Sequence, residues 1–85
     1  MLLNVKVQVM EIIEPIYKAN SFNELNRVYD EVNARINEGI NGMRLAGCWD
    51  EDEITEVEDY AVCQMDYAHQ SRAMALAIRR ENYIF

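Results

Sequence analysis

The feature that most constrains the fold is the stretch from Asp50 to Arg80, which contains neither glycine nor proline. Asp50 and Glu53 have the spacing of an N-terminal capping box, in which two side chains satisfy free backbone amides at a helix start. Behind that start, apolar or small residues recur every three or four positions, which predicts one buried helix face. They are Ile54, Val57, Ala61, Ala68, Ala75 and Ile78. We therefore predict one unbroken helix, roughly 45 Å long at about 1.5 Å per residue.

Charge is distributed unevenly along this predicted helix. Its first ten residues carry seven acids, near the positive end of the helix dipole, while Arg72 and Arg79 lie toward the negative end. Seven acids exceed what capping needs, and their mutual repulsion costs stability. One hypothesis is that part of the run docks a basic surface of a partner protein; the simpler interpretation is a solvated helix start. The residues in this hypothesis are Asp50, Glu51, Asp52, Glu53 and Glu56.

Residues 2–18 fit two patterns. Val5, Val7 and Val9 alternate with polar residues as in a strand, yet the apolar residues of this segment also fit helical spacing. A lone strand would leave its backbone groups unpaired, so we favour a helix, with strand pairing across a dimer as the alternative for residues 2–10. Pro15 is expected to kink this helix or to end it near Glu14.

A second helix is predicted to begin at a capping box formed by Ser21 and Glu24. Its apolar residues keep a three-four spacing typical of a coiled-coil seam. They are Phe22, Leu25, Tyr29, Val32 and Ile36. We expect this helix to end near Glu38, with Gly39 or Gly42 as its C-cap, so that Gly39–Trp49 forms the main connection.

These segments predict one all-α domain over residues 1–85, either a three-helix bundle or a helical hairpin with one long C-terminal helix. The first two helices would each be about half as long as the third. They either lie end to end along it or leave part of its apolar face bare. In the second case a second copy would cover that face, and we expect a homo-oligomer.

Composition narrows the classes of partner and compartment. The net charge is −7, so phosphate backbones and anionic lipid would repel the chain, and we expect neither nucleic-acid nor membrane binding. No apolar run approaches the ~20 residues that a membrane helix needs. The N-terminus lacks the basic segment of a secretion signal, and Cys48 and Cys63 are then expected to be reduced thiols in the cytoplasm.

A line of asparagines is the least ordinary feature of the second helix. Asn costs roughly 0.5–0.7 kcal/mol relative to Ala inside a helix, so a solvated flank alone would favour other residues. The line consists of Asn23, Asn26, Asp30, Asn33 and Asn37. We hypothesise that this edge hydrogen-bonds a partner or a small polar ligand; the simpler interpretation is a tolerated polar border of the apolar seam.

Catalytic and metal-binding patterns are weak. Cys63, Asp66 and His69 share one helix, but a structural zinc site needs four ligands and the repeated Glu-x-x-His motif of di-iron bundles is missing. No nucleophile lies at a suitable spacing from a base, and the chain has a single histidine. We predict a protein that is not an enzyme and that uses no metal or cofactor.

The sequence therefore favours a non-enzymatic protein that binds and modulates a protein partner. A small acidic chain of this kind suits an inhibitor or adaptor, including one encoded by a phage or mobile element. The alternative is an oligomer that binds or sequesters a nucleotide or other small anion in a pocket between subunits, where aromatic and cationic side chains meet. Its candidate residues are Tyr17, Lys18, Tyr67 and Arg72.

Overall fold

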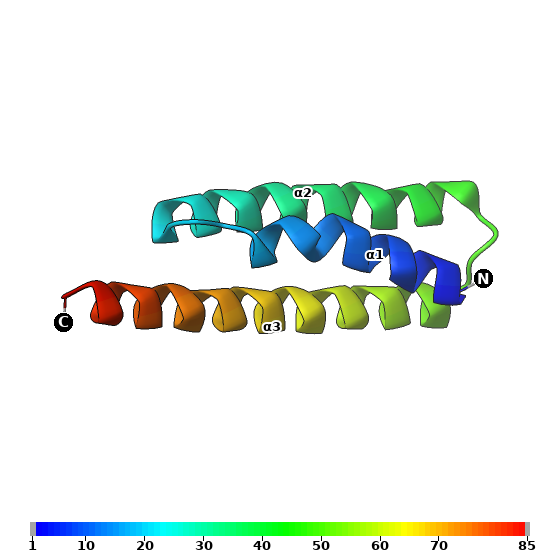
Figure 1. Ribbon diagram of the computed structural model, residues 1–85. Coiled ribbons are helices and arrows are strands. Elements are labelled where there is room, and N and C mark those ends of the chain that lie inside the picture. The colour runs from blue at the N-terminus through cyan, green and yellow to red at the C-terminus, as the bar shows by residue number, and fades with distance from the viewer. Residues whose placement is uncertain (1, 85) are drawn as a thin grey trace.

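The structure of the chain, a computed structural model, describes the backbone of residues 2–84 and the side chains of residues 2–79. Over this part the chain forms three helices and no strand: α1 (Leu2–Tyr17), α2 (Phe22–Ala46) and α3 (Glu51–Ile84). The helices α1 and α3 run parallel, and α2 runs antiparallel to both (Figure 1). The all-α class and the long, unbroken C-terminal helix are confirmed, and residues 2–10 are helix rather than strand.

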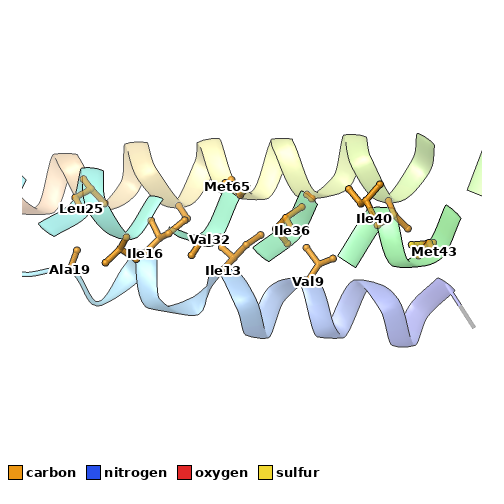
Figure 2. Packing of buried hydrophobic residues seen from close by; sticks show 14 of the residues in the cluster. Val9, Ile13, Ile16, Ala19, Leu25, Val32, Ile36, Ile40, Met43 and Met65 are labelled. Atoms are coloured by element: carbon orange, nitrogen blue, oxygen red, sulfur yellow. The ribbon is translucent and has the colours of Figure 1, made fainter. Parts of the chain in front are cut away.

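The core is one continuous cluster of apolar side chains enclosed by the three helices (Figure 2). It contains no buried polar side chain among the described residues, so burial of apolar surface is what holds the helices together. Ala61 and Ala68 are completely buried, and their small side chains let the neighbouring helices approach α3 closely. The core residues are Val9, Ile13, Ile16, Ala19, Leu25, Val28, Val32, Ile36, Ile40, Met43, Ile54, Val57, Ala61, Met65, Ala68 and Leu76.

Both predicted capping boxes are present. The backbone N–H of Glu24 donates to Ser21 Oγ (3.1 Å), and Glu24 Oε2 accepts from the backbone N–H of Asn20 (2.8 Å). At the start of α3 the exchange is reciprocal: Asp50 Oδ1 accepts from the N–H of Glu53 (2.9 Å), and Glu53 Oε1 accepts from the N–H of Asp50 (3.1 Å). Each box satisfies amides that a bare helix start would leave unpaired.

The predicted end of the second helix near Glu38 was wrong. Helix α2 continues through Gly39 and Gly42 to Ala46, and Gly47, with φ of 72°, is its left-handed C-cap. Each internal glycine costs about 1 kcal/mol relative to alanine. Continuing the helix buries Ile40 and Met43, and that burial outweighs the cost of the glycines at roughly 1.5–3 kcal/mol per large apolar side chain. The connection to α3 is therefore residues 47–50, not Gly39–Trp49.

Of the two outcomes predicted for Pro15, a kink or a helix end near Glu14, the helix end was wrong. Helix α1 includes Pro15 and continues to Tyr17. Proline removes one backbone donor, but here it lies in the last turn, so only one hydrogen bond of the helix is lost. The following residue, Ile16, is completely buried, and the N–H of Lys18 donates to the Pro15 carbonyl (3.1 Å) to close the helix.

The two shorter helices lie side by side against α3 rather than end to end (Figure 1). At the turn between them, Arg72 Nε donates to the carbonyl of Ala19 (2.6 Å). Just beyond this contact, three successive residues are all exposed: Ala77, Ile78 and Arg79. Successive helix residues point about 100° apart, so at this level no neighbouring helix covers any side of α3 that these residues occupy. The long helix therefore extends beyond α1 and α2, and we call residues 77–84 the α3 extension.

Candidate functional site

The predicted asparagine line borders an open groove between α2 and α3, on the side of the bundle away from α1. The groove has a volume of about 460 Å³. Its floor is apolar and its α2 wall is made largely of amide side chains. The lining residues are Asn33, Ile36, Asn37, Ile40, Asn41, Arg44, Glu58, Val62 and Met65. We call it the α2–α3 groove.

Asn33, Asn37 and Asn41 form the amide row of this groove. They follow one another every four residues, which is about 6 Å along a helix. All three are exposed, and the side-chain hydrogen bonds between α2 and α3 in the described part of the chain fall outside this row. Each amide thus keeps two donors and an acceptor available to a binding partner.

A polar cluster lies one turn beyond Asn33 at one end of the groove. The Tyr29 hydroxyl donates to Asp66 Oδ1 (3.1 Å), and the His69 ring packs edge-on against Tyr29 with centroids 5.2 Å apart. Asn26 Oδ1 lies 3.5 Å from His69 Nε2. Through these contacts Asp66 and His69 pack against α2. Their spacing along α3 is therefore explained by contacts between the two helices, without a metal ion.

The environment of Tyr29 raises the pKa of its hydroxyl above the ordinary value of 10.0. Desolvation by partial burial is the largest cause, because it disfavours the phenolate. The hydrogen bond donated to Asp66 and the negative charges of Asp66 and Asp30 act in the same direction. The hydroxyl is therefore a firmly protonated donor throughout the physiological pH range.

An ion pair closes the other end of the groove. Arg44 Nη2 lies 2.5 Å from Glu58 Oε1, joining the last turn of α2 to the second turn of α3. Both side chains are partly exposed, so the pair contributes at most about 1 kcal/mol and is weakened by salt. Its effect on the groove is geometric, because it ties the end of the amide-bearing α2 wall to the α3 wall.

Other members of the predicted partner-binding set lie outside the amide row. Asn23 and Asp30 are exposed on α2, and Asn26 faces His69. In the acidic run, Asp50 and Glu53 cap the helix, Glu51 and Asp52 are exposed, and Glu56 lies 3.8 Å from Lys6. The structure therefore brings together Asn33 and Asn37 but distributes the acids around the start of α3.

Only some of the residues of the predicted anion pocket lie close together in the structure. Tyr17 ends α1 and Lys18 follows it, and Arg72 donates to the carbonyl of Ala19 next to them. Lys18 already lies 3.0 Å from Glu14, and Tyr67 is largely exposed on α3. One donor of Arg72 is thus committed to holding the α1–α2 turn, a structural role that its position in the sequence did not indicate.

Sequence reasoning missed Asn41 and Arg44. Asn41 continues the asparagine line four residues after Asn37, so the pattern itself contained the signal. It was overlooked because the helix was expected to end near Glu38. Arg44 was missed for the same reason, and its pairing with Glu58 depends on a contact between helices that spacing along one helix does not reveal.

A second groove, of about 390 Å³, lies between α1 and α2 near the 47–50 connection. It is mainly apolar and is lined in part by Gly39 and Gly42. A β-carbon built on either glycine would meet no atom within 4 Å. Packing within the chain therefore does not require glycine at these two positions of α2.

Comparisons with protein-family models, curated proteins and solved structures found no match to this chain. Among the described residues, no three side chains of the metal-binding types gather into a group that could hold an ion. None of the described helices combines the length and apolar character needed to cross a membrane.

Proposed function

We propose that this chain is a small acidic, non-enzymatic protein that binds and modulates a protein partner, as an inhibitor or adaptor does, through the α2–α3 groove. The observation that supports the proposal is the amide row of Asn33, Asn37 and Asn41, exposed beside an apolar floor. These residues cost helix stability, roughly 0.5–0.7 kcal/mol each relative to Ala. An external partner would use the hydrogen-bonding groups that the fold itself leaves unused.

The spacing of the row favours an extended segment of the partner. Its amides repeat about every 6 Å, and alternate residues of an extended chain repeat roughly every 6.6–6.8 Å. Each Asn side chain can donate to a backbone carbonyl and accept from a backbone N–H. The apolar floor, which includes Val62 and Met65, would receive the alternate side chains that point into the groove.

Charge favours a partner with basic side chains. Within the groove, Glu58 is paired with Arg44. The negative charges of Asp30 and Asp66 lie beside Tyr29, beyond the Asn33 end of the groove. The net charge of −7 would also attract a basic surface from a distance, and this attraction would increase the association rate. We therefore propose a loop or strand that contains Lys or Arg.

The test uses a displayed library of extended peptides that vary in Lys and Arg content. Wild type is compared with the triple variant Asn33→Ala, Asn37→Ala, Asn41→Ala. Three net hydrogen bonds of about 0.5–1.5 kcal/mol each predict that the triple variant binds selected peptides at least roughly tenfold more weakly. The matched control, Asn4→Ala with Asn20→Ala, removes exposed asparagines outside the groove and should bind as wild type does.

Two readouts make the result decisive. The triple variant should unfold at a higher temperature than wild type, because alanine is the better helix former, so weaker binding would not reflect lost structure. Raising salt to about 0.5 M should weaken the binding of basic peptides through screening. The proposal is wrong if no peptide is selected or if the triple variant binds selected peptides as tightly as wild type.

We also propose that the chain is a homo-oligomer, because the α3 extension lies beyond α1 and α2 (Figure 1). The alternative function, an oligomer that binds a nucleotide or other anion through Tyr17, Lys18, Tyr67 and Arg72, stays a prediction. Inorganic phosphate and ATP are its first probes. A saturable rise in melting temperature with either anion would support it, since a ligand that binds only the folded state stabilises that state.

A further inference from the structure

The side of α3 that faces α1 carries a long line of apolar side chains that are exposed or, at Tyr60, half-buried. Tyr60, Tyr67 and Met74 recur every seven residues and therefore stay on one stripe of the helix; Tyr67 and Met74 are each 65% exposed. On α1, Leu3 and Val7 are 74% and 50% exposed and line a shallow depression of about 410 Å³ that Tyr60 also borders. We call this surface the α1–α3 face.

The apolar line continues onto the α3 extension. Ile78 follows Met74 by four residues, so it lies close to the same stripe, and 54% of it is exposed. The face therefore has a depression at one end, beside α1, and a projecting apolar helix end at the other. Contiguous exposed apolar surface of this kind is uncommon on monomers and marks interaction sites.

We propose that the α1–α3 face binds the same face of a second copy of the chain, with the two α3 helices antiparallel and crossing at Tyr67. This proposal rests on the homo-oligomer proposed above and specifies its interface. In a two-fold dimer each contact occurs twice, and positions equally far before and after Tyr67 lie opposite each other. Tyr60 of one protomer then lies opposite Met74 of its partner, each seven residues from the crossing point.

The register also matches the depression to the extension. Lys6 Nζ lies 3.8 Å from Glu56 Oε2 and 5.3 Å from the centroid of the Tyr60 ring, so α1 passes Glu56 and Tyr60 at about Lys6. Leu3 and Val7, on either side of Lys6, border that same region. The position opposite Glu56 in this arrangement is Ile78, since both are eleven residues from the crossing point. The extension of one copy thereby covers the depression of the other.

Charge distinguishes this arrangement from its parallel counterpart. A parallel pair would bring together two acidic helix starts, each carrying seven acids in residues 50–59. An antiparallel pair instead brings the acidic start of each α3 toward Arg79 of its partner. Opposite charges near the edge of an interface favour the correct orientation, and like charges disfavour the wrong one. The charge distribution along α3 thus favours the antiparallel orientation over the parallel one.

The long side of the molecule, on which the α1–α3 face lies, is large enough for a stable dimer. The molecule measures 55 × 18 × 15 Å, so a face of 55 by 15 Å has a projected area of about 800 Å². Specific interfaces bury about 800 Å² on each partner. The long, narrow shape of the bundle therefore provides a standard-sized interface only along its length, where the α1–α3 face lies.

Sedimentation equilibrium of the full chain tests the proposal without any other partner. From about 1 to about 200 µM, the expected mass approaches that of two 9.9 kDa chains. Tyr67→Glu with Met74→Glu should weaken the dimer by on the order of 100-fold, because charges would be buried at its centre. The matched control, Leu45→Glu with Ala34→Glu, adds the same charge at exposed apolar residues outside the face and should remain dimeric.

Cysteine cross-linking gives an independent measurement that does not depend on a destabilised variant. In a Cys48→Ser, Cys63→Ser background, Tyr67→Cys places two thiols at the crossing point, and oxidation should give a covalent dimer. Val62→Cys, on the other side of α3, should not cross-link within the dimer, because its two copies are too far apart for a disulfide.

The possible outcomes distinguish a failure of the proposed interface from a failure of the homo-oligomer proposal. A mass of 9.9 kDa throughout the concentration range would overturn both the homo-oligomer and the proposed face. A dimer that survives Tyr67→Glu with Met74→Glu, or in which Val62→Cys cross-links as efficiently as Tyr67→Cys, would overturn the α1–α3 face alone. Dimer formation that is lost only in the face variants, with Tyr67→Cys cross-linking selectively, supports the proposal.

Discussion

The two sides of α3 hold their neighbouring helices in different ways. On one side, α1 runs parallel to α3 and is packed through apolar side chains, with the Lys6–Glu56 pair as its ion pair to α3. On the other side, α2 runs antiparallel, and polar contacts border its apolar seam: Tyr29 with Asp66, and Arg44 with Glu58. The edge of α3 that borders α1 is therefore mainly apolar, and the edge that borders α2 is polar. We call these edges the α1 margin and the α2 margin.

This difference shows how one helix serves two kinds of contact. Directional hydrogen bonds at the α2 margin fix the separation of the groove walls and leave the amide row unpaired for a partner. The α1 margin leaves apolar area exposed, and apolar contact is non-directional, so it favours association with another apolar face. We accordingly propose that the α2 side binds a different protein and that the α1 side binds a second copy of the chain.

The largest expected effect comes from removing the anchor of α1. Ile13 is 0% exposed, and Ile13→Ala should lower the free energy of unfolding by about 2–5 kcal/mol, because it removes buried apolar surface and leaves a cavity. Chemical denaturation measures the change. The control from the same helix, Val7→Ala, should change the stability of the monomer by less than about 1 kcal/mol because Val7 is half exposed. Equal effects would show that α1 is not held by its buried side.

An intermediate effect of opposite sign is expected within α2. Gly39→Ala with Gly42→Ala should raise the free energy of unfolding by up to about 2 kcal/mol, because alanine is the better helix former by about 1 kcal/mol. Neither new methyl group meets an atom within 4 Å. Thermal and urea unfolding measure the gain, and Gly47→Ala is the contrasting variant. It should destabilise the chain, because Gly47 has a positive φ of 72° that alanine adopts poorly.

The smallest expected effect is a pH dependence at the α2 margin. The raised pKa of Tyr29 means that the folded state holds the hydroxyl proton more tightly than the unfolded state. This contribution to stability is fully present below the ordinary pKa of 10.0 and is lost as pH rises through the higher folded value. The stability difference between wild type and Tyr29→Phe should therefore be constant at lower pH and narrow above pH 10.

Urea unfolding of both proteins from neutral to alkaline pH measures that narrowing. Tyr17→Phe is a suitable control on α1, because it removes a hydroxyl without touching the contact between Tyr29 and Asp66. A difference that widens above pH 10 would contradict the assigned hydrogen bond, since an ionised Tyr29 cannot donate to Asp66.

Local sequence signals predicted most of the fold. Both capping boxes, the apolar seam of α2 and the unbroken α3 were visible in the spacing of residues, because capping and helical periodicity act over three or four positions. The asparagine line was visible for the same reason. The helix ends predicted near Glu38, and near Glu14 as one of two outcomes for Pro15, were wrong. In both places local propensity opposed a helix that tertiary burial of Ile16, Ile40 and Met43 stabilises.

The sequence alone thus determined three amphipathic segments, an acidic helix start and an asparagine edge. Only the tertiary structure decided that α1 and α2 lie side by side, that α3 projects beyond them, and that Asn33, Asn37 and Asn41 face a groove. The physical reason is that the two kinds of interaction act over different distances along the chain. Periodicity and capping depend on neighbours within one or two turns, whereas the pairing of helices depends on apolar surfaces far apart in the chain that must be buried together.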